Sequence, residues 1–222
     1  MAYLGLALYA EGPSDYRFLS PLLVRVVEDI FFERPAGMLD LGPMIELTEP
    51  DEFRGEPRAS RIVEAARVAA GGFHILFVHA DGSADHEQAR REQVEPGLQR
   101  FLHEFPSGYE GVAVVPVREM EAWAIADGDA LRGAFGTTLS DGDLGIPLRA
   151  RDIERELDPK RVLEQAYARV LGEVPRGRGK TSAAFLDLIG QTVSLRRLSE
   201  LQAFQRLRTE ITTALRALHI VR

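Results

Sequence analysis

The chain has 222 residues, a formal net charge of −7 and no cysteine. This length can bury one large hydrophobic core, alone or with a modest appendage. Without cysteine there are no disulfides, thiolate metal ligands or cysteine nucleophiles, and the composition fits a reducing compartment. No apolar run approaches the roughly 20 residues of a membrane span, and the N-terminus lacks a signal-peptide pattern. We therefore expect a cytoplasmic protein with no membrane partner.

The first part of the chain alternates between strand and helix signals. Residues 3–10 predict a strand, and Glu11-Gly12-Pro13-Ser14 leads into a predicted helix over residues 15–32. Further strands and helices are expected at residues 44–47, 59–70, 73–80, 85–105, 111–117 and 119–127. Short, uninterrupted apolar runs are typical of strands buried on both faces of a parallel sheet. The alternation of strands and helices predicts an α/β domain over residues 1–130 that is Rossmann-like, with a mostly parallel sheet and helices on its faces.

The second part reads differently. Residues 131–150 are rich in glycine and predict an irregular connection, and residues 151–222 predict an α-helical section packed on the same domain. Its helices are expected at residues 158–171, 181–189 and 198–218. Residues 1–150 hold 13 Lys and Arg against 25 Asp and Glu, whereas residues 151–222 hold 14 against 9. This division would suit an acidic site beside a basic surface that holds a polyanion, although solvated surface charge explains it equally well.

Three of the predicted strands lead directly into acidic residues. Glu11 follows the first, Asp81 and Asp85 follow the third, and Glu119 and Glu121 follow the fourth. The carboxyl ends of parallel strands meet at one edge of a sheet, which is where ligands bind in open α/β folds. Acids gathered there repel one another unless a divalent cation joins them. The pattern therefore predicts a Mg²⁺ site, with Mn²⁺ as a possible substitute.

Each of these acids also has a structural interpretation. Glu11 could stabilise a helix N-terminus, and Asp85 could be the N-cap of the following helix. If a helix begins near Glu119, only one of the two glutamates can face the site; we favour Glu121, because an apolar face starts just after it. His79 and His86 flank the aspartates and are candidates for supporting them through hydrogen bonds, as is Glu119.

Basic residues near these acids are candidates for phosphate contacts. Arg118 directly precedes Glu119, and a basic turn over residues 176–181 contains Arg176, Arg178 and Lys180. The turn does not match a nucleotide-binding P-loop, because Val174 stands where that motif needs glycine and no strand precedes it. It is either a phosphate contact or a solvated loop.

Together the segments AEGPSDYRFL (residues 10–19), FVHADGSADH (77–86) and VREMEAWAIAD (117–127) resemble a bacterial family of Toprim-like proteins of unknown function. The segments DPKRVL (158–163) and GKTSAAF (179–185) strengthen the resemblance. Toprim domains occur in topoisomerases, bacterial primases and overcoming-lysogenization-defect nucleases. The resemblance implies metal-dependent phosphodiester chemistry, with Glu11 as general acid/base or ligand and with Asp81 and Asp85 as the Mg²⁺-binding pair. Three residues separate this pair, whereas the Toprim pattern is Asp-x-Asp.

These observations favour a Mg²⁺-dependent nuclease-like hydrolase acting on nucleic acid, with Glu11, Asp81, Asp85 and Glu121 at the metal and Glu11 and Glu121 in catalytic roles. The alternative is a non-catalytic module that binds a partner, such as a companion ATPase of a defence system or a second copy of itself. A phosphoacceptor receiver domain is a poor third interpretation. It needs an acidic pair after the first strand and a lysine at a later strand end, and this chain has neither.

Overall fold

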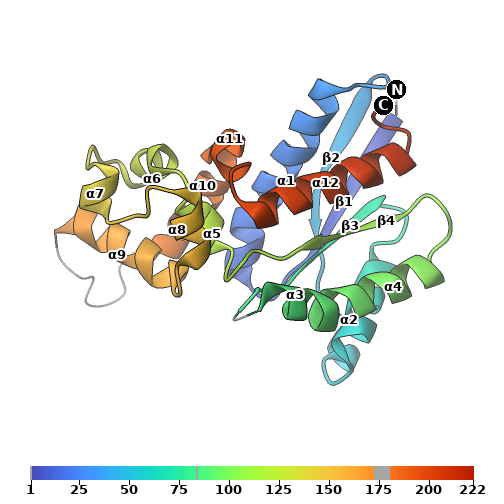
Figure 1. Ribbon diagram of the computed structural model, residues 1–222. Helices are drawn as coiled ribbons and strands as arrows, with labels where there is room; N and C mark the ends of the chain where they lie inside the picture. The colour runs from blue at the N-terminus through green and yellow to red at the C-terminus, as the bar shows by residue number, and fades with distance from the viewer. Residues whose placement is uncertain (1, 84, 173–180) are drawn as a thin grey trace.

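A computed structural model describes residues 2–83, 85–172 and 181–222 of the protein. Its centre is a four-stranded sheet made of β1 (Ala2–Tyr9), β2 (Leu39–Glu46), β3 (Ile75–His79) and β4 (Glu110–Val114). The strand order is β2-β1-β3-β4, and each neighbouring pair is parallel (Figure 1). The predicted α/β class with a parallel sheet is therefore confirmed.

Helices cover both faces of the sheet, which explains why the inner strands read as continuous apolar runs. Leu4, Leu6 and Leu8 of β1 are buried with α1 (Pro13–Glu33) and α12 (Gln202–Ala217). The alternate residues Ala7 and Tyr9 are buried on the opposite face with α2 (Arg58–Val68) and α4 (Glu95–Glu104). This alternation follows from the two-residue period of a strand.

Two elements differ in length or continuity from the sequence expectation. Strand β2 starts at Leu39 rather than at residue 44, and its pairing with β1 shifts register between Leu4 and Leu6. It is an edge strand whose side chains are mostly exposed or half-buried, so its apolar signal is weak. The helix expected at residues 85–105 consists of α3 (His86–Ala89), the π-helical turn η2 (Arg90–Val94) and α4, with Pro96 in the first turn of α4. Proline is tolerated there because that N–H has no partner within the helix.

Residues 131–150 are not the irregular connection that their glycines suggested. They contain most of α6 (Gly128–Phe135), all of α7 (Asp141–Leu144) and the start of α8 (Ala150–Arg155). Gly136 and Gly145 have φ values of +66° and +69° and end the first two of these helices. Glycine is favoured at such left-handed C-terminal positions, so these residues mark helix ends rather than disorder.

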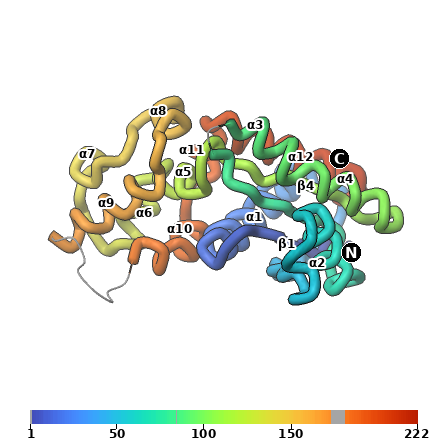
Figure 2. The backbone as a smooth tube through the Cα atoms, turned by 90° about the horizontal axis from the view of Figure 1, so that it is seen from below, coloured from blue at the N-terminus to red at the C-terminus, as the bar shows by residue number. Residues whose placement is uncertain are grey.

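The rest of the chain is helical, as predicted, but more finely divided. The elements are α5 (Glu121–Ala124), α9 (Pro159–Leu171), the 3₁₀ turn η3 (Ser182–Phe185), α10 (Leu186–Thr192) and α11 (Leu195–Leu198), while a second 3₁₀ turn, η1 (Asp51–Phe53), precedes α2. Helices α5–α10 form a lobe beside the sheet (Figures 1 and 2). The lobe shares one continuous core with α1 and α12, and Trp123 meets Phe204 edge to face at 5.5 Å. Among the described residues, no helix combines the length and apolarity needed to cross a bilayer.

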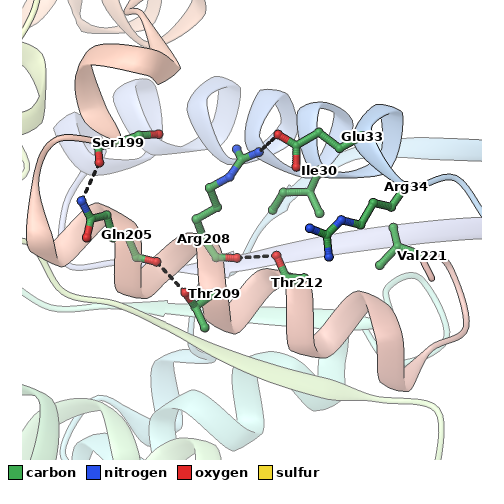
Figure 3. A pocket seen from close by; sticks show the side chains of 9 residues that line it. All are labelled: Ile30, Glu33, Arg34, Ser199, Gln205, Arg208, Thr209, Thr212 and Val221. Carbon is green, nitrogen blue, oxygen red and sulfur yellow. Dashed lines mark hydrogen bonds and ion pairs between the residues drawn. The ribbon is translucent and has the colours of Figure 1, made fainter.

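Both ends of the chain lie at the amino edge of the sheet (Figure 1). Pro35 and Val221 form an isolated β-bridge there. Nearby, a pocket of about 310 Å³ opens between α1 and α12 (Figure 3). The guanidinium of Arg208 in this pocket contacts both Asp29 and Glu33 at 2.6 Å, so its charge is already compensated.

Candidate functional site

The strand order places the candidate site at the switch point of the sheet. Strand β1 leads to β2 on one side, whereas the chain then crosses back to β3 on the other side of β1. In open α/β sheets, ligands bind outside the carboxyl ends of the strands at such a reversal. Glu11 and Asp81 each come two residues after the adjacent strands β1 and β3. The carboxyl ends of these strands point toward the lobe of α5–α10 (Figure 1).

The loop that carries Asp81 is fixed to the segment that follows β4. The Ser83 N–H donates to the Arg118 carbonyl at 3.1 Å, and the Arg118 guanidinium donates to the Ser83 carbonyl at 3.0 Å. A side chain at Gly82 would collide with the carbonyl oxygens of Pro116 and Val117. Only glycine therefore lets the two segments approach so closely, and this approach brings Asp81 toward Glu119 and Glu121. Arg118, expected to hold a phosphate, has a structural bond as well.

Three carboxylates repel one another at this edge. Glu121 is 7% exposed, and burial together with the charges of Glu119 and Asp81 raises its pKa to about 7. Burial and the Asp81 charge also raise the pKa of Glu119. Both glutamates resist ionisation because burial and the neighbouring negative charges disfavour their charged forms. Glu121 is the more buried of the two glutamates, and both lie in the same electrostatic environment. The prediction that Glu121 rather than Glu119 faces a cation stays a prediction.

Positive charge near these acids is sparse. In the described part of the chain, Asp81, Glu119 and Glu121 make no ion pair with any arginine or lysine, and the charge of Lys160 at the start of α9 partly opposes their repulsion. The backbone N–H of Lys160 donates to Glu119 Oε2 at 3.4 Å. Over residues 2–83, 85–172 and 181–222, no three acidic or histidine side chains converge closely enough to form a metal-ligand group. The acids therefore share one edge without meeting at one point.

His79 lies directly beneath Asp81 and is fully buried. Its Nδ1 is 2.8 Å from the Val114 carbonyl, which can only accept, so Nδ1 carries a proton. Its Nε2 faces Asp81 Oδ1 at 3.5 Å, too far for a firm hydrogen bond, and neither atom has another partner in the described structure. Burial lowers the pKa of His79, but Asp81, Asp15 and the Val114 carbonyl outweigh this effect and raise it.

Glu11 is held by an arginine that the sequence did not single out. Arg58 Nη1 lies 3.2 Å from Glu11 Oε1, while its Nη2 donates to the His79 carbonyl at 2.6 Å and its Nε to the Gln93 carbonyl at 3.0 Å. Arg58 therefore joins α2, β3 and η2 and positions Glu11 at the same time. The Glu11 side chain is 39% exposed, so this pair is open to competition from solvent and ions.

Asp15 is a further acid near this edge that the sequence interpretation treated only as a helix start. It is 9% exposed, accepts from the Gly12 N–H at 2.8 Å, and its charge reaches His79. Its position three residues into a helix that opens with Gly-Pro-Ser was the available signal, because such a residue turns back toward the strand end.

The remaining expected residues are less engaged with the site. Asp85 is exposed, and its Oδ1 accepts from the N–H groups of Glu87 and Gln88, which makes it the N-cap of α3. His86 lies 3.5 Å from Glu87. The ligand role expected for Asp85 and the supporting role expected for His86 stay predictions. Arg176, Arg178 and Lys180 lie outside the described residues.

Comparison with protein-family models, curated proteins and solved structures gives no match for this chain. The Toprim resemblance therefore depends on the sequence segments that carry it.

Proposed function

We propose that the protein is a Mg²⁺-dependent, nuclease-like phosphodiester hydrolase built on a Toprim-like sheet and acting on nucleic acid in the cytoplasm. One observation carries the proposal. Asp81, Glu119 and Glu121 lie together beside the switch point without arginine or lysine ion-pair partners among the described residues, and burial and mutual repulsion raise the pKa of both glutamates. Such a grouping is unfavourable by itself and is stabilised by a divalent cation.

The chemistry of the donors fits Mg²⁺. All the candidate ligands are carboxylate oxygens, which hard cations prefer, and Asp81 Oδ1 is buried without a hydrogen-bond partner among the described atoms. Asp81, Glu121 and Glu11 would hold the cation, or Mn²⁺ in its place, and Glu119 and His79 would support them. Asp85 is the least favoured ligand, because its carboxylate already caps α3.

The bound cation would supply a Lewis acid and neutralise charge on the phosphate. The two roles proposed for Glu121 are alternatives. As a ligand of the cation it would be ionised, whereas in the absence of direct coordination its pKa of about 7 would suit it to accept and return a proton near neutral pH. Glu11 is the second candidate for acid/base work, and Arg58 fixes its orientation. Arg118 offers a guanidinium beside the acids for a substrate phosphate, as Arg176, Arg178 and Lys180 do in the sequence prediction.

The alternative function is a non-catalytic module that binds a companion ATPase or a second copy of the chain. The observation that favours it is the lack of convergence of the acids among the described residues. In that case a cation would stabilise a surface for the partner, and the isolated chain would not cleave nucleic acid.

The test combines cation binding with cleavage. We expect Mg²⁺ and Mn²⁺ to raise the melting temperature of the wild type and to support nicking of plasmid DNA or cleavage of RNA. Asp81→Asn and Glu121→Gln should remove both responses. Glu28→Gln, an exposed change of equal charge on α1, is the matched control and should retain both. A cation response without cleavage would favour the non-catalytic module, and identical responses in all four proteins would disprove the site.

A further inference from the structure

Beside the acidic edge, the segment that spans α8 and the start of α9 carries five exposed cations. Its exposed basic residues are Arg149, Arg151, Arg155, Lys160 and Arg161, which we call the α8–α9 cation strip. Arg151 and Arg155 are four residues apart on α8 and therefore lie on the same helical face. Buried Ile153 lies between them in the sequence and points to the core.

The segment holds four acids, Asp152, Glu154, Glu156 and Asp158, against the five cations, and most of these acids are directed to backbone N–H groups rather than to the cations. Each of three acids is used by a backbone N–H: Glu154 Oε1 accepts from Ala203, Glu156 Oε1 from Asp158, and Asp158 Oδ1 from Arg161, at 3.3, 3.1 and 2.9 Å. The fourth acid, Asp152, is 3.4 Å from Arg151, its neighbour in the chain.

The other four cations of the strip have no ion-pair partner within the described part of the protein. They differ in this respect from most arginines on the sheet domain, such as Arg67 and Arg90, each of which contacts two carboxylates. Unpaired arginines on a surface are free to bind phosphate, for which the planar guanidinium is well shaped.

The strip is also tied to the acidic edge. The Lys160 N–H contacts Glu119 at 3.4 Å, and α5, which begins at Glu121, lies against α9. A polyanion that enters a negatively charged catalytic edge needs compensating positive charge next to it. The strip provides this charge on the side of the lobe.

We propose that the α8–α9 cation strip is the surface that binds the phosphodiester backbone of a nucleic-acid strand and guides it to the acidic edge. This inference rests on the proposed function, because it assigns the substrate-binding surface of the same site. Backbone contacts of this kind hold a strand in position but carry no sequence information.

The experiment measures binding separately from cleavage. Fluorescence anisotropy with labelled 20-nucleotide DNA and RNA strands, and with the DNA duplex, is recorded in EDTA over a series of salt concentrations. The test variant is Arg149→Gln/Arg155→Gln/Arg161→Gln. The control is Arg34→Gln/Arg216→Gln/Arg222→Gln, which removes the same charge from exposed positions near the chain ends. Circular dichroism melting verifies that both triple variants fold.

We expect the test variant to weaken binding about 10-fold or more and to lower the salt slope by about 2 on the single strands and about 3 on the duplex, since each of the three lost phosphate contacts lowers it by about 0.7 and about 0.9 respectively. The control should change affinity less than about 2-fold. Equal losses in both variants, an unchanged affinity in the test variant, or no binding by the wild type would overturn the inference. The DNA and RNA arms identify which backbone is bound.

Failure of the inference can be told from failure of the proposed function. In one case only the test variant loses binding, and the wild type binds nucleic acid but never cleaves it. This result would support the strip as the binding surface and disprove the hydrolase. The reverse result has two parts: the protein hydrolyses a small phosphodiester, bis-p-nitrophenyl phosphate, in a cation-dependent manner, and the strip variant binds nucleic acid as the wild type does. This result would support the hydrolase and disprove the role of the strip.

Discussion

Glu121 shows how one buried side chain couples stability to pH at this edge. Its pKa in the folded protein is about 7, against an ordinary value of 4.5. A carboxyl group with a raised pKa holds its proton more tightly in the folded state. The contribution of Glu121 to stability is therefore greatest below about pH 4.5 and is lost as pH rises to about 7, above which the group is ionised in both states.

We expect Glu121→Gln to remove this loss. At pH 8 the variant should be more stable than the wild type by up to about 3 kcal/mol, because a shift of one pKa unit corresponds to about 1.4 kcal/mol. The measurement is the free energy of unfolding in urea between pH 5 and pH 8. Saturating Mg²⁺ should reduce the wild-type slope if the ionised side chain binds the cation. Parallel wild-type and variant profiles would contradict the assigned pKa.

At the scale of elements, the β3–α3 loop owes its position to Gly82. Gly82→Ala should destabilise the protein by about 1–3 kcal/mol, the cost of forcing atoms into a tightly packed site. It should also abolish any response to Mg²⁺, because Asp81 moves with the loop. The added methyl group would meet backbone carbonyl oxygens, which cannot move aside as the end of a flexible side chain can. Thermal melting with and without Mg²⁺ measures both effects.

Gly133→Ala is the matched control for this change. Gly133 lies inside α6, and an added methyl group would meet nothing within 4 Å. The same substitution should there stabilise the protein by about 0.5–1 kcal/mol, because alanine loses less backbone freedom in a helix. If Gly82→Ala were tolerated as well as Gly133→Ala, the close approach of the two segments would be refuted.

These elements also show what the sequence can and cannot predict. Strands β1 and β3 were located within two residues at each end, because burial on both faces produces unbroken apolar runs. The extent of β2 was wrong, since an edge strand carries few buried side chains. The helices α6 and α7 were missed because their terminal glycines look like loop residues until their left-handed φ is known.

The candidate site also has features that the sequence predicts and features that it does not. Strand polarity alone predicted that one edge of the sheet holds Asp81, Glu119 and Glu121. The pairing of Glu11 with Arg58 did not, because a helix residue 47 positions away has no local signal. The burial of Asp15 depends on tertiary packing, which periodicity does not report.

At the scale of the whole molecule, the sheet and the helical lobe should unfold together. Helix α12 lies on β4 and α1, and Phe204 at its start is fully buried against Trp123 of the lobe. Trp123 is the single tryptophan in the chain, so its fluorescence reports on the contact between the two parts. Urea unfolding followed by this fluorescence and by far-ultraviolet circular dichroism should give one coincident transition.

Phe204→Ala tests the same coupling. We expect a loss of about 3–5 kcal/mol, as for other large-to-small changes of buried aromatic residues, with both optical signals still changing at one urea concentration. Leu188→Ala, at an exposed position of α10, should cost less than about 1 kcal/mol. Two separate transitions in the wild type would mean that the lobe is an independent domain.

The position of the chain ends has a practical consequence. Residue 2 begins β1 and Val221 bridges to Pro35, so both ends emerge on the side of the sheet opposite Asp81 and Glu121. A reporter protein or purification handle joined at either terminus would leave this acidic edge accessible.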